Sequence, residues 1–125
     1  MNDAFLRLCL IAIAAITVLS GATQMVAGEW IMAVIANSAT PAEVHLFGTI
    51  GMFMVITGAM FLQSLLTRSA EPAIPLWIAV QKLAAAVLVV IAFTKGFFLW
   101  LALGVAVFDA LSAALAFLFW RRLPR

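Results

Sequence analysis

Four long apolar runs make up most of the chain, and short polar stretches separate them. The runs cover Phe5–Ala27, Pro41–Leu66, Ala73–Thr94 and Phe97–Trp120. Each is longer than the ~20 residues with which a helix crosses the hydrocarbon core of a bilayer. Apolar and polar residues do not alternate within a run, which argues against the strands of a membrane barrel. Helices then satisfy every backbone polar group in lipid. The pattern predicts an all-α bundle of four transmembrane helices, with residues 1–125 forming a single integral membrane domain.

The polar stretches mark where the helices begin and end. Thr40, Pro41 and Glu43 have the spacing of a capping box with proline at the first helical position, which places a helix start at Pro41. A short polar loop, 67–72, ends in a proline that is compatible with a helix start. We expect Gly28–Ala39 to be the one sizeable loop, a short outer segment lying on the surface or re-entering the membrane.

Composition agrees with a membrane protein. Hydrophobic residues make up 67% of the 125 residues and charged residues only 10%, against roughly 45–50% and ~25% in soluble domains. So few charges do not cover the surface of a small water-soluble fold. The net charge of +2 does not indicate a nucleic-acid partner, because most basic residues lie at the ends of apolar runs.

The distribution of those basic residues predicts the orientation. With four spans, both termini and loop 67–72 share one side of the membrane, and the opposite side has Lys95. The shared side carries five arginines: Arg7, Arg68, Arg121, Arg122 and Arg125. The positive-inside rule then places both termini in the cytoplasm of a cell with a bacterial-type inner membrane. An alternative is that residues 1–22 form a cleaved signal peptide, since Arg7 precedes an apolar stretch ending in small residues.

Two charged residues lie deep within the third and fourth runs. Lys82 and Asp109 are nearly equidistant in sequence from the turn at Lys95. If these helices form an antiparallel hairpin, both groups lie ~20 Å from that turn. A lone charge there costs at least ~2.5–3.5 kcal/mol, and an opposite charge at the same depth offsets that cost. We therefore expect a buried Lys82–Asp109 contact, either structural or coupled to proton movement. Alternatives are a lysine reaching the headgroups and a protonated Asp109 bonded to Ser112.

Further polar groups accompany this pair. Gln81 lies near the same depth, and the first run carries a polar stripe that includes Thr17 and Gln24. Such groups usually hydrogen-bond between membrane helices. Alternatively, together with Lys82 and Asp109, they line a small polar cavity.

Small residues recur at helical spacing in the second and fourth runs. Gly48, Gly51 and Gly58 share one face, and alanines share the face of Asp109. Small residues let membrane helices approach closely. These faces predict helix packing and keep the carboxyl of Asp109 away from lipid.

The outer side carries the remaining titratable residues. These are Glu29, Glu43 and the one histidine, His45, which is interpreted as a hydrogen-bonded boundary residue, with weak metal binding by the three as an alternative. No zinc cluster, phosphate loop, nucleophile elbow or dinucleotide fingerprint occurs. The sequence therefore predicts no catalytic residue, metal or cofactor.

Several local patterns resemble the DoxX-like group of small bacterial membrane proteins. They are Arg7 at the start of the first helix, Ser20-Gly21 followed by Gly28, and the run from Gly51 to Gly58. The resemblance implies a four-helix bundle and, for some members, a role as a membrane subunit beside redox enzymes. Small multidrug transporters are less similar, because their hallmark glutamate in the first helix is missing here.

Three functions are consistent with these features. The leading one is a non-enzymatic accessory or subunit protein that packs against another membrane protein or a second copy of itself. The second is a small proton-coupled transporter that uses Asp109. The third is a quinone- or lipid-binding membrane enzyme subunit with Gln81, Lys82 and Asp109 around a lipid-facing cavity.

Overall fold

The computed structural model describes residues 1–68 and 71–124, and within them the chain forms four α-helices. Their bounds are α1 Asp3–Ile35, α2 Pro41–Leu66, α3 Ala73–Thr94 and α4 Ala102–Arg122. Each helix is long and apolar enough to cross a membrane. The predicted all-α architecture with four membrane-spanning helices is confirmed at this level, and the bounds of α2 and α3 agree with the sequence pattern.

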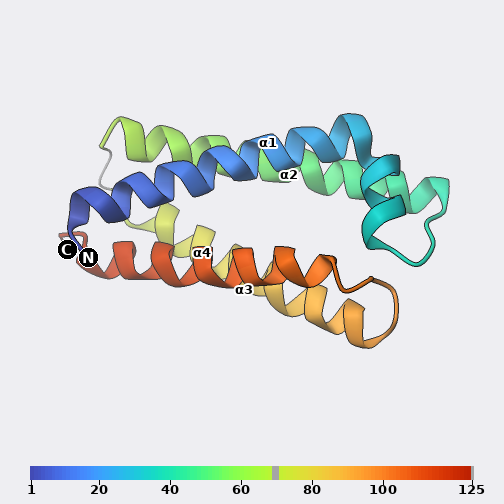
Figure 1. The fold of residues 1–125 in the computed structure, drawn as a ribbon. Coiled ribbons are helices and arrows are strands. Elements are labelled where there is room, and N and C mark those ends of the chain that lie inside the picture. Colours follow the sequence, from blue (N-terminus) through green and yellow to red (C-terminus); the bar gives the residue numbers. More distant parts are fainter. Residues whose placement is uncertain (69–70, 125) are drawn as a thin grey trace.

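The helices form two antiparallel hairpins. Figure 1 shows α1 lying along α2, and α3 along α4, with both ends of the chain, the end of α2 and the start of α3 at one end of the molecule. The two hairpins contact each other much less than the helices within each hairpin do. The molecule is therefore two tightly packed pairs held together at a limited number of places.

One of those places is an apolar core near the termini. It joins residues of all four helices: Leu6, Leu10, Ala14, Phe61, Leu65, Ile78, Ala79 and Ala116. The second place is the opposite end, where the α1–α2 and α3–α4 connections pair through their backbones. There the Asn37 N–H donates to the Phe97 carbonyl at 3.1 Å, and the Leu99 N–H donates to the Ile35 carbonyl at 2.8 Å.

The first helix is longer than the sequence analysis predicts. Helical structure continues through Gly28 to Ile35, so the expected loop Gly28–Ala39 is wrong and the connection is reduced to residues 36–40. Ala27 has non-helical backbone angles (φ −130°, ψ 27°), and Figure 1 shows the chain changing direction there. Gly28 does not end the helix; a Cβ there would lie in ordinary contact with Phe47 and Val44 of α2. An alanine would therefore also fit at this position, and the packing of α1 against α2 does not require glycine there.

The fourth helix begins five residues later than predicted, at Ala102 instead of Phe97. Gly96 makes the turn with a positive φ of 74°, which glycine adopts without steric cost. The next residues then use their backbone groups in the pairing with Ile35 and Asn37. Because these backbone N–H and carbonyl groups have hydrogen-bond partners in the other hairpin, helical hydrogen bonds are not required to satisfy them.

The arginines gather at the end that holds the termini, here called the basic end. Arg7 lies in the second turn of α1, Arg68 is the second residue after α2, and Arg121 and Arg122 end α4. Lys95 lies at the opposite end. Arg125, part of the orientation argument, and residues 69–70 of the predicted polar loop lie outside the described residues.

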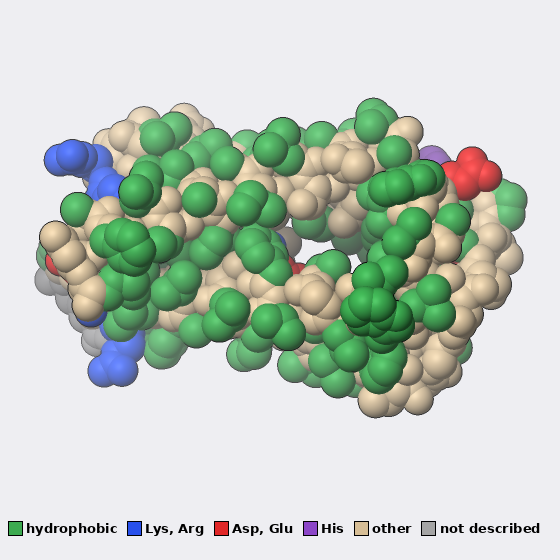
Figure 2. All heavy atoms as spheres, viewed as in Figure 1, with side chains coloured by type: hydrophobic (Ala, Val, Ile, Leu, Met, Phe, Trp, Pro, Cys, Tyr) green, Lys and Arg blue, Asp and Glu red, His purple; other side chains and the backbone are tan. Residues whose placement is uncertain are grey.

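Large apolar side chains are exposed on all four helices. Val26, Leu19, Leu88, Leu111 and Ile56 are examples, each more than half exposed. Figure 2 shows such side chains spread over the visible face between the two ends, whereas Lys and Arg gather at one end. An exposed apolar surface this extensive is typical of contact with lipid, not water.

Candidate functional site

The third and fourth helices bring Lys82 and Asp109 together. The lysine Nζ and the aspartate Oδ1 are 2.7 Å apart, as both a hydrogen bond and an ion pair. Their side chains are only 8% and 10% exposed. The predicted buried contact is confirmed. It forms because two helices joined by a turn place residues at equal distances from that turn side by side.

The surroundings of the pair explain how the charges are accommodated. Lys82 Nζ also lies 5.2 Å from the centre of the Phe108 ring, whose π-face attracts a cation. Buried small residues on α4, Ala106 and Ala113, allow the close approach of α3. The ammonium group is therefore stabilised by a carboxylate and by an aromatic ring of the same neighbouring helix.

Asp109 does not use its neighbour Ser112. The hydroxyl of Ser112 donates to the backbone carbonyl of Phe108 at 2.7 Å. In residues 1–68 and 71–124, neither Lys82 nor Asp109 has another hydrogen-bond or ion-pair partner. The arrangement is thus a simple two-member pair. Such a pair balances charge and fixes the register of α3 against α4.

The pair lies at the edge of the apolar core. Ile78 and Ala79, one turn before Lys82, belong to that core. Nearer the middle of the molecule than this core, Figure 2 shows an opening between the two hairpins, with acidic and basic side-chain atoms at its border. Two cavities lie elsewhere, at the ends of the molecule, and neither of these is lined by Lys82 or Asp109.

The other polar residues of the membrane interior have separate partners. Gln81 Nε2 donates to Thr57 Oγ1 of α2 at 3.3 Å, a contact between the two hairpins. Gln24 Nε2 lies 3.3 Å from the sulfur of Met54, and its buried Oε1 has no hydrogen-bond partner. The hydroxyl of Thr17 donates to the Ile13 carbonyl within its own helix. These groups act as contacts within and between helices, and the structure does not gather them around the ion pair.

The titratable residues predicted for the outer side are all exposed. Glu43 completes the capping box with Thr40, its Oε2 accepting from the Thr40 N–H at 2.6 Å. Glu29 lines a cavity of about 520 Å³ at the far end. His45 lies in the second turn of α2. Within the described part of the chain, no three His, Cys, Asp or Glu residues are placed to hold a metal ion.

One site was missed by sequence reasoning. A cavity of about 450 Å³ at the basic end is lined by Arg7, Arg68 and Arg122, together with Asp3. The sequence analysis uses these arginines only to predict orientation and does not group them into a site, because they lie far apart in the sequence. Their shared position at the helix ends was the available signal.

Comparison of this chain with models of known protein families, with curated proteins and with solved structures found no match.

Proposed function

We propose that this chain is a small multi-pass protein of a bacterial-type inner membrane that acts as a non-enzymatic accessory or subunit protein. In this proposal it resembles the DoxX-like group, with both termini in the cytoplasm and the basic end at the cytoplasmic surface. The observation that carries the proposal is the self-contained Lys82–Asp109 pair. Its two charges are matched to each other inside one hairpin, as expected of a structural contact.

The surface supports a role in association. The hairpins contact each other mainly at their two ends, which leaves apolar faces of α2, α3 and α4 open to neighbours in the membrane. Lipid and a second protein satisfy such a face equally well, since both present apolar atoms; packing and hydrogen bonds decide between them. The proposed partners are therefore the lipid bilayer and either a second copy or another membrane protein.

Native mass spectrometry of the protein, extracted from its own membrane in a mild detergent, tests this function. We expect a complex of fixed stoichiometry, either with itself or with one other membrane protein. The Lys82→Met/Asp109→Asn double variant has uncharged side chains of similar size at both positions. We expect it to form the same complex. A protein that is monomeric and alone under all mild extraction conditions would contradict the proposal.

A proton-coupled transporter that uses Asp109 is the second candidate. The specific observation in its favour is the opening between the hairpins that Figure 2 shows. Proton coupling requires a carboxyl that gains and loses a proton as water reaches it. Vesicles containing the protein and an internal pH-sensitive dye distinguish the two functions. Asp109→Asn abolishes proton uptake in a transporter, whereas neither the wild type nor the variant conducts protons in an accessory protein.

A further inference from the structure

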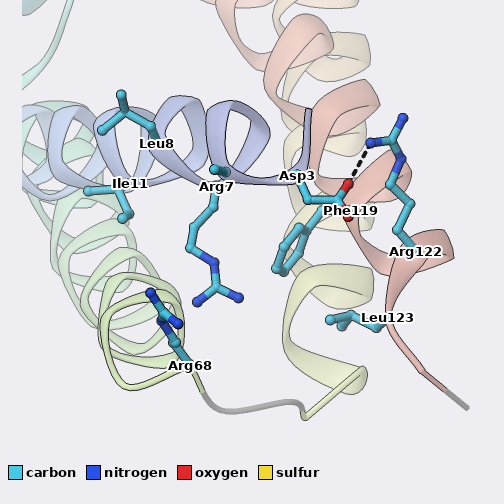
Figure 3. Close-up of a pocket in the computed structure, with 9 residues that line it drawn as sticks. Asp3, Arg7, Leu8, Ile11, Arg68, Phe119, Arg122 and Leu123 are labelled. Atoms are coloured by element: carbon cyan, nitrogen blue, oxygen red, sulfur yellow. Dashed lines mark hydrogen bonds and ion pairs between the residues drawn. The ribbon is translucent and has the colours of Figure 1, made fainter. Parts of the chain in front are cut away.

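The cavity at the basic end has an unusual balance of charge. Figure 3 shows it between the start of α1, Arg68 beyond the end of α2, and the end of α4. Three guanidinium groups and one carboxylate line it, those of Arg7, Arg68, Arg122 and Asp3. The lining therefore carries a net charge of +2.

Among the residues that the structure describes, a carboxylate neutralises one of the three guanidinium groups. Arg122 Nη1 lies 2.7 Å from Asp3 Oδ1. Arg7 instead donates to the Leu65 carbonyl at 3.2 Å and lies 5.9 Å from the centre of the Phe119 ring. In residues 1–68 and 71–124, neither Arg7 nor Arg68 has an ion-pair partner. Two positive charges thus remain for a ligand.

These two free charges are directed at a common space. In Figure 3 the side chains of Arg7 and Arg68 extend from different elements toward the same part of the cavity. The Leu65 carbonyl and the Phe119 ring hold Arg7 in that position. Like charges facing a shared space repel each other, and an anion between them removes that repulsion. Guanidinium groups bind phosphate oxygens in a planar, two-bond geometry.

The remaining wall of the cavity is apolar. Leu8, which directly follows Arg7 in α1, and Ile11, one turn further toward the middle of the bundle, also line it. Leu8 is 62% exposed. When a phosphate group lies on the arginines, a hydrocarbon chain attached to it has room alongside α1, against this apolar wall. Free inorganic phosphate would leave the apolar wall without a contact.

We propose that this cavity binds the phosphodiester headgroup of an anionic phospholipid, with Arg7 and Arg68 on the phosphate and Leu8 and Ile11 beside an acyl chain. Basic pockets between membrane helices at the headgroup level suit such lipids. The site requires only that the basic end lies at a membrane surface, on whichever side. It is independent of the proposed accessory function.

Lipid binding is measured by native mass spectrometry of the detergent-solubilised protein during titration with phosphatidylglycerol. The test variant is Arg68→Gln, because Arg68 has no ion-pair partner among the described residues and lies outside the helices. The matched control is Arg121→Gln, which removes the same charge from the same end but does not line the cavity. Arg68→Lys keeps the charge without the planar fork. Circular dichroism and gel filtration verify that all variants fold.

We expect the wild type to bind one phosphatidylglycerol in preference to phosphatidylcholine. Arg68→Gln weakens this binding at least about tenfold, as expected for one lost charge-assisted hydrogen bond, and Arg68→Lys recovers part of the loss. Arg121→Gln stays within about twofold of the wild type.

Three results would overturn the proposal. Equal weakening by Arg68→Gln and Arg121→Gln would indicate general surface charge. Equal affinity for phosphatidylcholine would show that the charge of the lipid is not recognised. Displacement of the lipid by inorganic phosphate at equal concentration would assign the cavity to a water-soluble phosphate.

Discussion

The backbones of α1 and α2 approach closely where the helices cross at Gly21 and Gly51. A Cβ atom added at Gly21 would lie 2.5 Å from the Gly51 carbonyl oxygen and 3.0 Å from the Val55 nitrogen. A Cβ added at Gly51 would lie 2.5 Å from the Gly21 carbonyl oxygen. Because the obstructing atoms include backbone, no side-chain rotation removes the clash. The helices must separate by about 1 Å to reach ordinary van der Waals contact.

We therefore expect Gly21→Ala and Gly51→Ala each to lower the free energy of unfolding by about 1–3 kcal/mol, the usual cost of overpacking. The separation also disturbs the neighbouring contact between Gln24 and Met54. The assay is denaturant-induced unfolding in detergent, followed by tryptophan fluorescence and circular dichroism.

Gly104→Ala is the matched control, since a Cβ at Gly104 would have no atom within 4 Å. Alanine in place of an exposed helical glycine stabilises a helix by about 0.5–1 kcal/mol. If all three alanine variants unfold at the same denaturant concentration, or if Gly104→Ala is the least stable, the helices do not cross at these glycines.

Three other predictions concern the helix ends and the orientation. Thr40→Ala removes the capping box of α2 and lowers the free energy of unfolding by about 0.5–2 kcal/mol, measured by thermal unfolding. Thr67→Ala, the control, removes only a hydroxyl bonded to the Gln63 carbonyl and has a smaller effect. Equal effects of the two variants would refute the capping role. Asp3→Asn breaks the exposed pair with Arg122 and changes stability by less than about 1 kcal/mol, and this small effect disappears in high salt; a large, salt-independent loss would contradict it. In the proposed orientation, a fluorescent protein fused to the C-terminal end is fluorescent in cells and alkaline phosphatase fused there is inactive; the reverse pattern would invert the topology.

The sequence predicted those features that depend on local signals or on counting along one hairpin. The capping box at Thr40 and the proline at position 72 placed the starts of α2 and α3. The Lys82–Asp109 contact followed because both residues are counted from the same turn at Lys95. Apolar length alone was enough to predict four spanning helices.

The far end was not predictable in the same way. Gly28 is a residue type that often ends a helix, but here it lies buried inside a helix that continues to Ile35 and faces Val44 and Phe47 of α2. The start of α4 depends on backbone pairing between Phe97–Leu99 and Ile35–Asn37, about 60 residues apart in sequence. No periodic pattern encodes such a pairing. The cavity of Arg7 and Arg68 escaped prediction for the same reason, since only the packing of α1 against α2 brings the two together.

A double-mutant cycle on Lys82 and Asp109 tests most directly whether the two buried charges stabilise each other. The stability of Lys82→Met, Asp109→Asn and the double variant is compared with that of the wild type by unfolding in detergent. We expect each single variant to lose about 3–5 kcal/mol, because one charge remains buried without a partner. The double variant then loses clearly less than the two single losses combined. If the two losses simply add, the charges are not coupled and the pair does not hold α3 to α4.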